Sequence, residues 1–246
     1  MSSKEGTYQN FEEERKVEGT SMKNKVKFVS ILGDSISTYS GYNPIGYKVF
    51  YDEYNSLRND MTSVYDTWWA KVNQFINAYI CVNNSYSGSK VTGEKFPSGN
   101  CDQRTSNLHT EQYTPDMILI YLGFNDFGNG VHITNDKLGS PSFFSSYYNM
   151  LQKIKMNYPK SRIICGTLME SYMKGDNSWK FPHKWAGVSI YEYNAAIKIA
   201  AEIAGIEVAD LASQNLRYET LDGSHPTKEG HITLAKAWIN CLKKTV

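Results

Sequence analysis

The order of apolar and polar positions predicts strands and helices that alternate along the chain. Apolar runs of strand length, rich in β-branched residues, occur at residues 26–32, 78–83, 117–122, 162–166 and 206–209. Apolar positions at helical spacing occur at about 64–76, 142–157, 189–204 and 227–243. This alternation predicts one parallel sheet with helices on both faces, an α/β fold.

The first predicted strand is followed directly by a short motif that contains a candidate nucleophile. Residues 26–32 (VKFVSIL) do not alternate cleanly, which is typical of a strand buried on both faces. The run stops at Gly33, Asp34 and Ser35, where a glycine allows the backbone to turn sharply. In open α/β sheets ligands lie beyond the carboxyl ends of the strands, where Ser35 would be a useful nucleophile. From this stretch alone, Asp34 and Ser35 could equally do no more than cap the next helix.

Three further polar segments flank predicted strands or helices. Ser87 and Gly88 follow the second strand, and the segment 123–126 (GFND) follows the third. Asp222 and His225 stand just before the last helix. Because the carboxyl ends of parallel strands lie on one edge of a sheet, we expect the first three motifs to meet there.

These residue types supply the parts needed for acyl transfer. A serine hydroxyl such as that of Ser35 is a poor nucleophile until a base, usually histidine, takes its proton. Asp222, three positions before His225, can hold the imidazole in the required tautomer. The Gly88 backbone N–H and the Asn125 side-chain amide are suitable donors for a tetrahedral oxyanion.

Taken together, the four segments resemble the motif blocks of the SGNH or GDSL hydrolases. Residues 33–35 (GDS) and 87–88 (SG) are similar to the first two blocks, and 123–126 (GFND) matches the third, GxND. Residues 222–226 (DGSHP) match the last block, DxxH followed by proline. The chain departs from the pattern at Ser85, where the family usually has glycine, and in lacking a glycine soon after Ser35.

The resemblance implies a flavodoxin-like three-layer α/β/α sandwich with a central parallel sheet of about five strands. It implies no metal and no cofactor. The implied triad is Ser35, His225 and Asp222, and the implied oxyanion donors are Ser35, Gly88 and Asn125. A GxSxG motif is absent around Ser35, which argues against the nucleophile elbow of the α/β-hydrolases.

Aromatic residues are unusually frequent, with 18 Tyr and 5 Trp. Several lie on loops expected to surround Ser35, and the candidates for substrate binding are Tyr39, Tyr86, Phe124, Trp179 and Trp185. They could stack on sugar rings or line an acyl pocket, or they could only keep long loops ordered.

We therefore expect an esterase that removes acetyl or another short acyl group from an O-acylated carbohydrate. The alternatives are a lipid or lysophospholipid esterase and a non-catalytic glycan-binding protein on the same fold.

The remaining polar residues have structural interpretations. Asp34 and Asp126 are expected to hold loops through side-chain to backbone hydrogen bonds. The other histidines have no motif support and are expected at the surface or in the core: His109, His132, His183 and His231. The four cysteines form no CxxC pair, so the sequence indicates neither a disulfide framework nor a zinc site.

Charge and length limit the possible partners and the domain count. The chain has 26 Lys and Arg against 25 Asp and Glu, so its net charge does not favour binding to nucleic acid or to an anionic membrane surface. No apolar run approaches the ~20 residues that span a bilayer.

Residues 1–21 are polar and are interpreted as a disordered leader or an added remnant before a natural start at Met22, with one domain over 22–246. We expect a cytoplasmic location; a secreted protein without its signal is the alternative.

Overall fold

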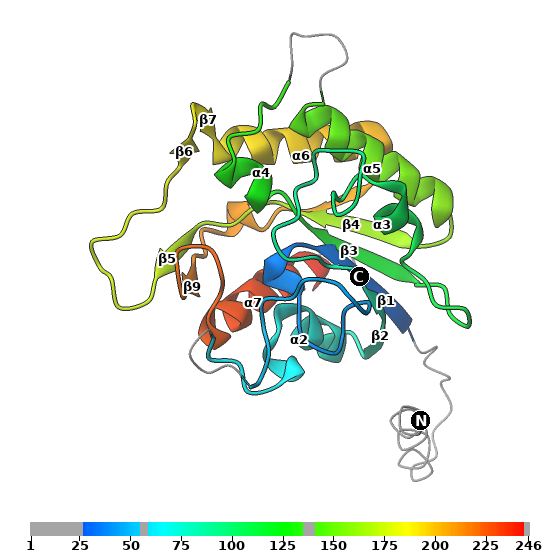
Figure 1. Ribbon diagram of the computed structural model, residues 1–246, viewed down its shortest axis with the longest axis horizontal. Coiled ribbons are helices and arrows are strands. Elements are labelled where there is room, and N and C mark those ends of the chain that lie inside the picture. The colour runs from blue at the N-terminus through cyan, green and yellow to red at the C-terminus, as the bar shows by residue number, and fades with distance from the viewer. Residues whose placement is uncertain (1–26, 55–58, 135–140, 244–246) are drawn as a thin grey trace.

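The computed structural model describes residues 27–54, 59–134 and 141–243 (Figure 1). At its centre is a five-stranded parallel sheet in the order β2-β1-β3-β4-β8. Its strands are β1 (Lys27–Gly33), β2 (Ala78–Asn83), β3 (Met117–Tyr121), β4 (Arg162–Gly166) and β8 (Glu207–Ala209). This is the flavodoxin-like strand order, and it confirms the predicted three-layer fold. The predicted leader, residues 1–21, lies outside the described residues.

Helices cover both faces of the sheet, as the alternation predicted (Figure 1). On one face lie α2 (Trp68–Phe75) and α7 (Lys228–Lys243), and on the other α5 (Phe143–Asn157) and α6 (Ile190–Ala204). The side chain of Ser142 caps α5 and that of Ser189 caps α6, each by accepting a backbone N–H of the first turn. α6 ends at Gly205, which has a left-handed φ of 64°.

The helix predicted over residues 64–76 is interrupted. Val64–Asp66 forms a short 3₁₀ helix, η2, and Thr67 is extended before α2 begins. The Asp66 carboxylate accepts the backbone N–H of Thr62 and of Ser63, which tightens the chain into the 3₁₀ turn. The Thr67 hydroxyl then accepts the Ala70 N–H and starts the α-helix anew.

Stretches predicted as irregular contain elements too short for periodicity to reveal. They are α3 (Asp102–Ser106), α4 (Phe124–Gly128), β5 (Ser171–Met173), β6 (Lys184–Trp185), β7 (Val188–Ser189), η3 (Ala212–Gln214) and β9 (Tyr218–Thr220). β5 and β9 form a small parallel pair, and β6 and β7 an antiparallel one. The β5–β9 pair matters for function because β9 leads directly into the segment that holds Asp222 and His225.

Two tryptophans of α2 connect the core to the end of β1. Trp68 is fully buried and stacks on Trp238 of α7, with ring centroids 5.2 Å apart. The indole N–H of Trp68 donates to Ser37 Oγ at 3.1 Å, and that of Trp69 donates to the Ser37 carbonyl at 3.0 Å. The turn after β1 is therefore fixed from the core side.

Among the described helices, none has the length and apolar character needed to span a membrane.

Candidate active site

The turn after β1 presents Ser35 at the carboxyl edge of the sheet. Ser35–Ser37 forms a 3₁₀ helix, η1, which Asp34 caps by accepting the Ile36 N–H at 3.0 Å. A side chain at Gly33 would lie 2.6 Å from Ser37 Oγ and 2.9 Å from Ser85 Oγ. Gly33 is not among the residues with positive φ, so close packing, rather than the sharp turn we expected, requires glycine here.

A tight turn at the end of β9 brings the imidazole of His225 to this serine. The Leu221 N–H donates to the His225 carbonyl at 2.8 Å and closes the turn. Gly223 has a φ of +91°, and a side chain there would lie 2.9 Å from the Trp179 ring. His225 Nε2 lies 2.9 Å from Ser35 Oγ, although the two residues are 190 positions apart.

Asp222 contacts the other side of the imidazole. Its Oδ2 lies 2.7 Å from His225 Nδ1, and its Oδ1 accepts the backbone N–H of His225 at 2.9 Å and of Ser224 at 3.0 Å. Burial raises the pKa of Asp222, but the hydrogen bonds from His225 and Ser224 outweigh it and lower the pKa to about 2. The ionised carboxylate favours the proton on Nδ1 and leaves the Nε2 lone pair facing the Ser35 hydroxyl.

The second and third motif segments join the first at the same edge. The Tyr86 N–H donates to the Gly33 carbonyl at 3.2 Å, which ties the segment before Gly88 to the end of β1. The Asn125 side-chain amide donates to the Ser89 carbonyl at 3.0 Å, which ties the third segment to the second. Gly88 is exposed with a φ of 82°, and within the described part of the chain its N–H donates no hydrogen bond.

Two buried aspartates hold the loops, as expected from the sequence. Asp126 accepts the backbone N–H of Val91 at 2.7 Å and of Thr92 at 3.0 Å, and burial outweighs these bonds to raise its pKa. Asp34 differs because its second oxygen, Oδ2, is buried and has no hydrogen-bond partner among the described residues. Burial accordingly raises the pKa of Asp34 to about 6.

Arg104 is a fully buried cation that the sequence did not reveal. Its guanidinium donates to the Gly33 and Asn84 carbonyls at 2.6 and 2.7 Å and to the Pro97 carbonyl at 2.7 Å. Burial lowers its pKa to about 10. It therefore ties together the segments that follow β1 and β2. A lone arginine in an irregular stretch carries no signal for such a role.

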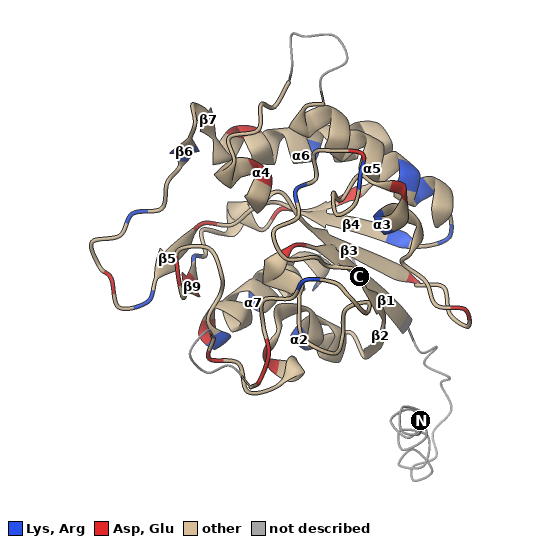
Figure 2. Cartoon of the chain, viewed as in Figure 1, with Lys and Arg blue, Asp and Glu red and all other residues tan. Residues whose placement is uncertain are grey.

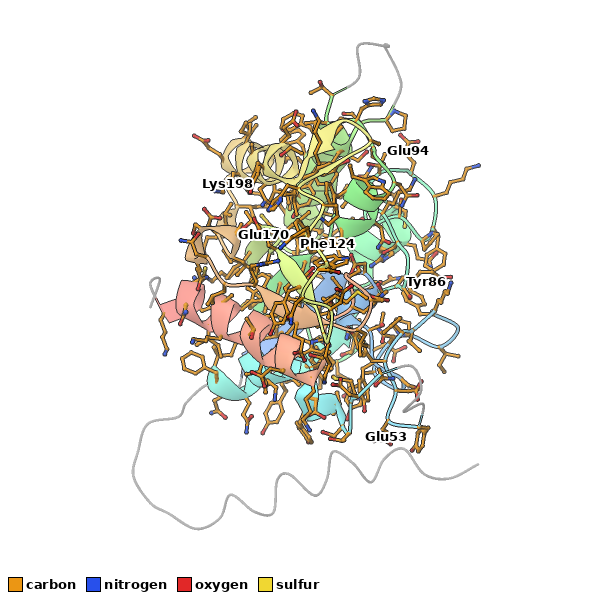
Figure 3. All side chains as sticks on the ribbon, turned by 90° about the vertical axis from the view of Figure 1, so that its left-hand side faces the viewer. Glu53, Tyr86, Glu94, Phe124, Glu170 and Lys198 are labelled. Carbon is orange, nitrogen blue, oxygen red and sulfur yellow. The ribbon has the colours of Figure 1, made fainter. Side chains whose placement is uncertain are left out.

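Three of the five candidate substrate-binding aromatics adjoin the motif segments, and Figure 3 labels two of them, Tyr86 and Phe124. Trp179 lies against Gly223, and Phe124 immediately precedes Asn125. Tyr86 packs with two further rings, at centroid distances of 5.5 Å to Tyr47 and 5.1 Å to Phe96.

The other two candidates lie elsewhere. Tyr39 is only 3% exposed and belongs to the hydrophobic core, so its ring is not available to a substrate. Trp185 is half-exposed on β6, in the small hairpin with β7, and its ring contacts no other aromatic ring among the described residues.

Sequence reasoning missed two neighbours of His225. The Phe50 ring stacks on the imidazole, with centroids 3.6 Å apart and an interplanar angle of 1°. The Tyr51 hydroxyl donates to the carbonyl of Pro226, the next residue after His225, at 2.9 Å. Both lie within a long segment without regular structure, where no pattern distinguishes them from other aromatics.

Charged residues of both signs are spread over the described chain. Figure 2 shows Lys and Arg interspersed with Asp and Glu over the helices and loops. Across residues 27–54, 59–134 and 141–243, no group of three or more His, Cys, Asp or Glu side chains is placed to hold a metal ion.

Comparison with known proteins identifies the family. The sequence model of the family described as GDSL-like lipase/acylhydrolase matches residues 27–180. The chain belongs to the GDSL-like lipase/acylhydrolase family. The description of the family, lipase/acylhydrolase, agrees with the expected ester hydrolase. The match includes Ser35, Gly88 and Asn125, whereas Asp222 and His225 lie beyond its end.

Individual relatives are distant. The chain is 26% identical over 180 residues to a multidomain esterase of Ruminococcus flavefaciens, covering 64% of this chain and 20% of that protein. It thus spans about a fifth of the length of that relative.

Solved structures share the fold. A protein of Bacteroides ovatus described as a GDSL-like lipase superimposes with a TM-score of 0.66 at 22% identity, covering 90% of this chain and 99% of that one. A carbohydrate esterase family 2 enzyme of Corynascus thermopiles, with a carbohydrate binding domain, gives 0.54 at 20% identity, covering 92% and 69%.

The buried carboxyl of Asp34 predicts a specific pH dependence of stability. Its folded pKa of about 6 lies above the unfolded value of 3.8, so the folded state loses stability as the pH rises from about 4 through 6. Asp34→Asn keeps the acceptor for Ile36 and removes this titration. We expect the free energy of unfolding of the variant to lose about 2 kcal/mol less than wild type between about pH 4.5 and about pH 7. Urea unfolding of both proteins at the two pH values measures this, and parallel pH dependences would contradict it.

Proposed function

We propose that this chain is a serine esterase whose catalytic triad is Ser35, His225 and Asp222. The observation that carries the proposal is the unbroken hydrogen-bonded path from Ser35 Oγ to His225 Nε2, at 2.9 Å, and from His225 Nδ1 to Asp222 Oδ2, at 2.7 Å. A nucleophile within reach of a base, which a third group orients, is the arrangement that activates a serine hydroxyl.

The reaction proceeds in two halves at this serine. Ser35 Oγ attacks the ester carbonyl while His225 Nε2 takes the hydroxyl proton, and the imidazolium is stabilised by Asp222. His225 then delivers the proton to the leaving alcohol, and the acyl group stays on Ser35. A water molecule, deprotonated by His225, attacks this acyl-enzyme and releases the acid, and the proton returns to Ser35.

The oxyanion formed in each half is held by the backbone N–H groups of Ser35 and Gly88 and by the Asn125 amide. Support comes from the free Gly88 N–H within the described part of the chain and from Asn125, where one amide N–H donates to Ser89 and leaves the second for a ligand. Such preorganised donors are each worth about 10²–10³ in turnover.

We further propose that the substrate is a short acyl ester of a carbohydrate. One neighbour of similar fold is a carbohydrate esterase. Partly exposed aromatic side chains suited to stacking on sugar rings lie by the edge that carries Ser35, and these are Tyr86, Phe124 and Trp179.

A lipid or lysophospholipid ester is the second candidate. The segment between η1 and η2 exposes two large apolar side chains, Ile45 at 99% and Tyr54 at 87%. Exposed apolar groups on a segment that follows the nucleophile are suited to contact with an aggregated lipid substrate.

Removing the proposed nucleophile tests the mechanism. We expect Ser35→Ala to lower kcat on an aryl acetate by at least about 10⁴-fold, because the remaining site can no longer form the acyl-enzyme. Ser161→Ala is the matched control, since Ser161 directly precedes β4 at the opposite edge of the sheet. Retention of activity by the Ser35 variant, with a normal thermal unfolding curve, would disprove the triad.

Acyl-chain length distinguishes the two substrate classes. A site built for acetyl groups rejects longer chains sterically, so we expect kcat/KM for 4-nitrophenyl acetate to exceed that for the octanoate by about tenfold or more. Acetate release from an acetylated monosaccharide should accompany this preference. A preference for octanoate, together with hydrolysis of lysophosphatidylcholine, would replace the carbohydrate proposal by the lipid one.

A further inference from the structure

The stacked pair of Phe50 and His225 has a geometry that general packing does not require. The planes of the two rings are nearly parallel, at 1° to each other, with ring centroids 3.6 Å apart. Phe50 is buried, at 9% exposure, so the ring covers one face of the imidazole and keeps water from it. The other aromatic neighbour, Tyr51, meets the imidazole edge-on at a centroid distance of 6.5 Å.

The backbone of this segment is tied to both turns of the site. The Thr38 hydroxyl donates to the Ser35 carbonyl and accepts the Phe50 N–H, each at 2.9 Å. The Ser40 N–H donates to the Tyr51 carbonyl at 2.9 Å. Because the Tyr51 hydroxyl also donates to the Pro226 carbonyl, Phe50 is fixed relative to both the nucleophile and the base.

We propose that Phe50 is a positioning residue for His225, holding the plane of the imidazole and stabilising its protonated form through the π face of the ring. The inference rests on the proposed role of His225 as the base. When Ser35 attacks, the imidazole becomes a cation directly over the ring face, and the negative face of the quadrupole attracts that cation. The stabilisation grows as the proton is transferred, so it lowers the barrier rather than strengthening substrate binding.

Other charges act on the same imidazole, and the test must separate them. They are Asp222 at 2.7 Å, Asp34 on the turn after β1 and His231 on α7. The pKa of Asp34 is about 6, so kcat is compared at one fixed pH, where the charge on Asp34 is the same for every variant.

The experiment replaces Phe50 in the full chain by phenylalanines that carry one, two or three fluorines. Fluorine withdraws charge from the ring face while the shape is nearly kept. We expect kcat on an aryl acetate to fall stepwise with each fluorine, by about threefold to tenfold at three, with KM unchanged. Phe50→Leu should lower kcat to a similar extent, and Phe50→Tyr should retain most of it.

The matched control is the same fluorinated series at Phe75, which is half-exposed at the last residue of α2 and should leave kcat unchanged. A kcat that does not change along the fluorinated series at Phe50 overturns the inference and makes the ring a packing element only. If Ser35→Ala also keeps its activity, the proposed triad itself is wrong, so the two failures are distinguishable.

Discussion

The hydrogen bond between Ser35 Oγ and His225 Nε2 joins residues that are 190 positions apart in the chain. It forms only when the turn that carries the serine and the turn that carries the histidine are both held in fixed positions. The serine turn is held by two indoles through Ser37 and by Arg104 through the Gly33 carbonyl. The histidine turn is held by the β5–β9 pair and its own closing bond. A displacement of ~1 Å between catalytic groups can cost on the order of 10²-fold in rate, so the proposed mechanism depends on these supporting contacts.

Two groups beside the serine turn are placed at a cost to stability. Asp34 has a buried oxygen without a hydrogen-bond partner among the described residues, and Arg104 keeps its guanidinium fully buried among backbone carbonyls. Burial disfavours the charged form of both, which raises one pKa and lowers the other. Local arrangements of this kind concentrate at functional sites, where the surrounding core sustains them. Here that core includes the Trp68–Trp238 stack and the central sheet.

Much of this architecture could be predicted from the sequence because it depends on short-range signals. Buried parallel strands appear as continuous apolar runs, and the Ser142 cap and Gly205 mark helix ends. The break at Thr67 was missed because the Asp66 bonds override an apolar pattern that remains helical. Arg104 and Phe50 were missed because their partners are distant in the chain, and neither lies in a motif. Tyr39 was misjudged since a tyrosine near the nucleophile gives no sign of whether its ring faces the core.

The central claim is that the imidazole and carboxylate activate this one hydroxyl. Intact-protein mass spectrometry after treatment with a fluorophosphonate tests it most directly, since only an activated serine reacts rapidly with such a reagent. The account predicts a single adduct, mapped by peptide sequencing to Ser35, and labelling that is strongly slowed in His225→Ala. A second serine labelled in place of Ser35, or labelling of Ser35 at an equal rate without His225, would contradict it.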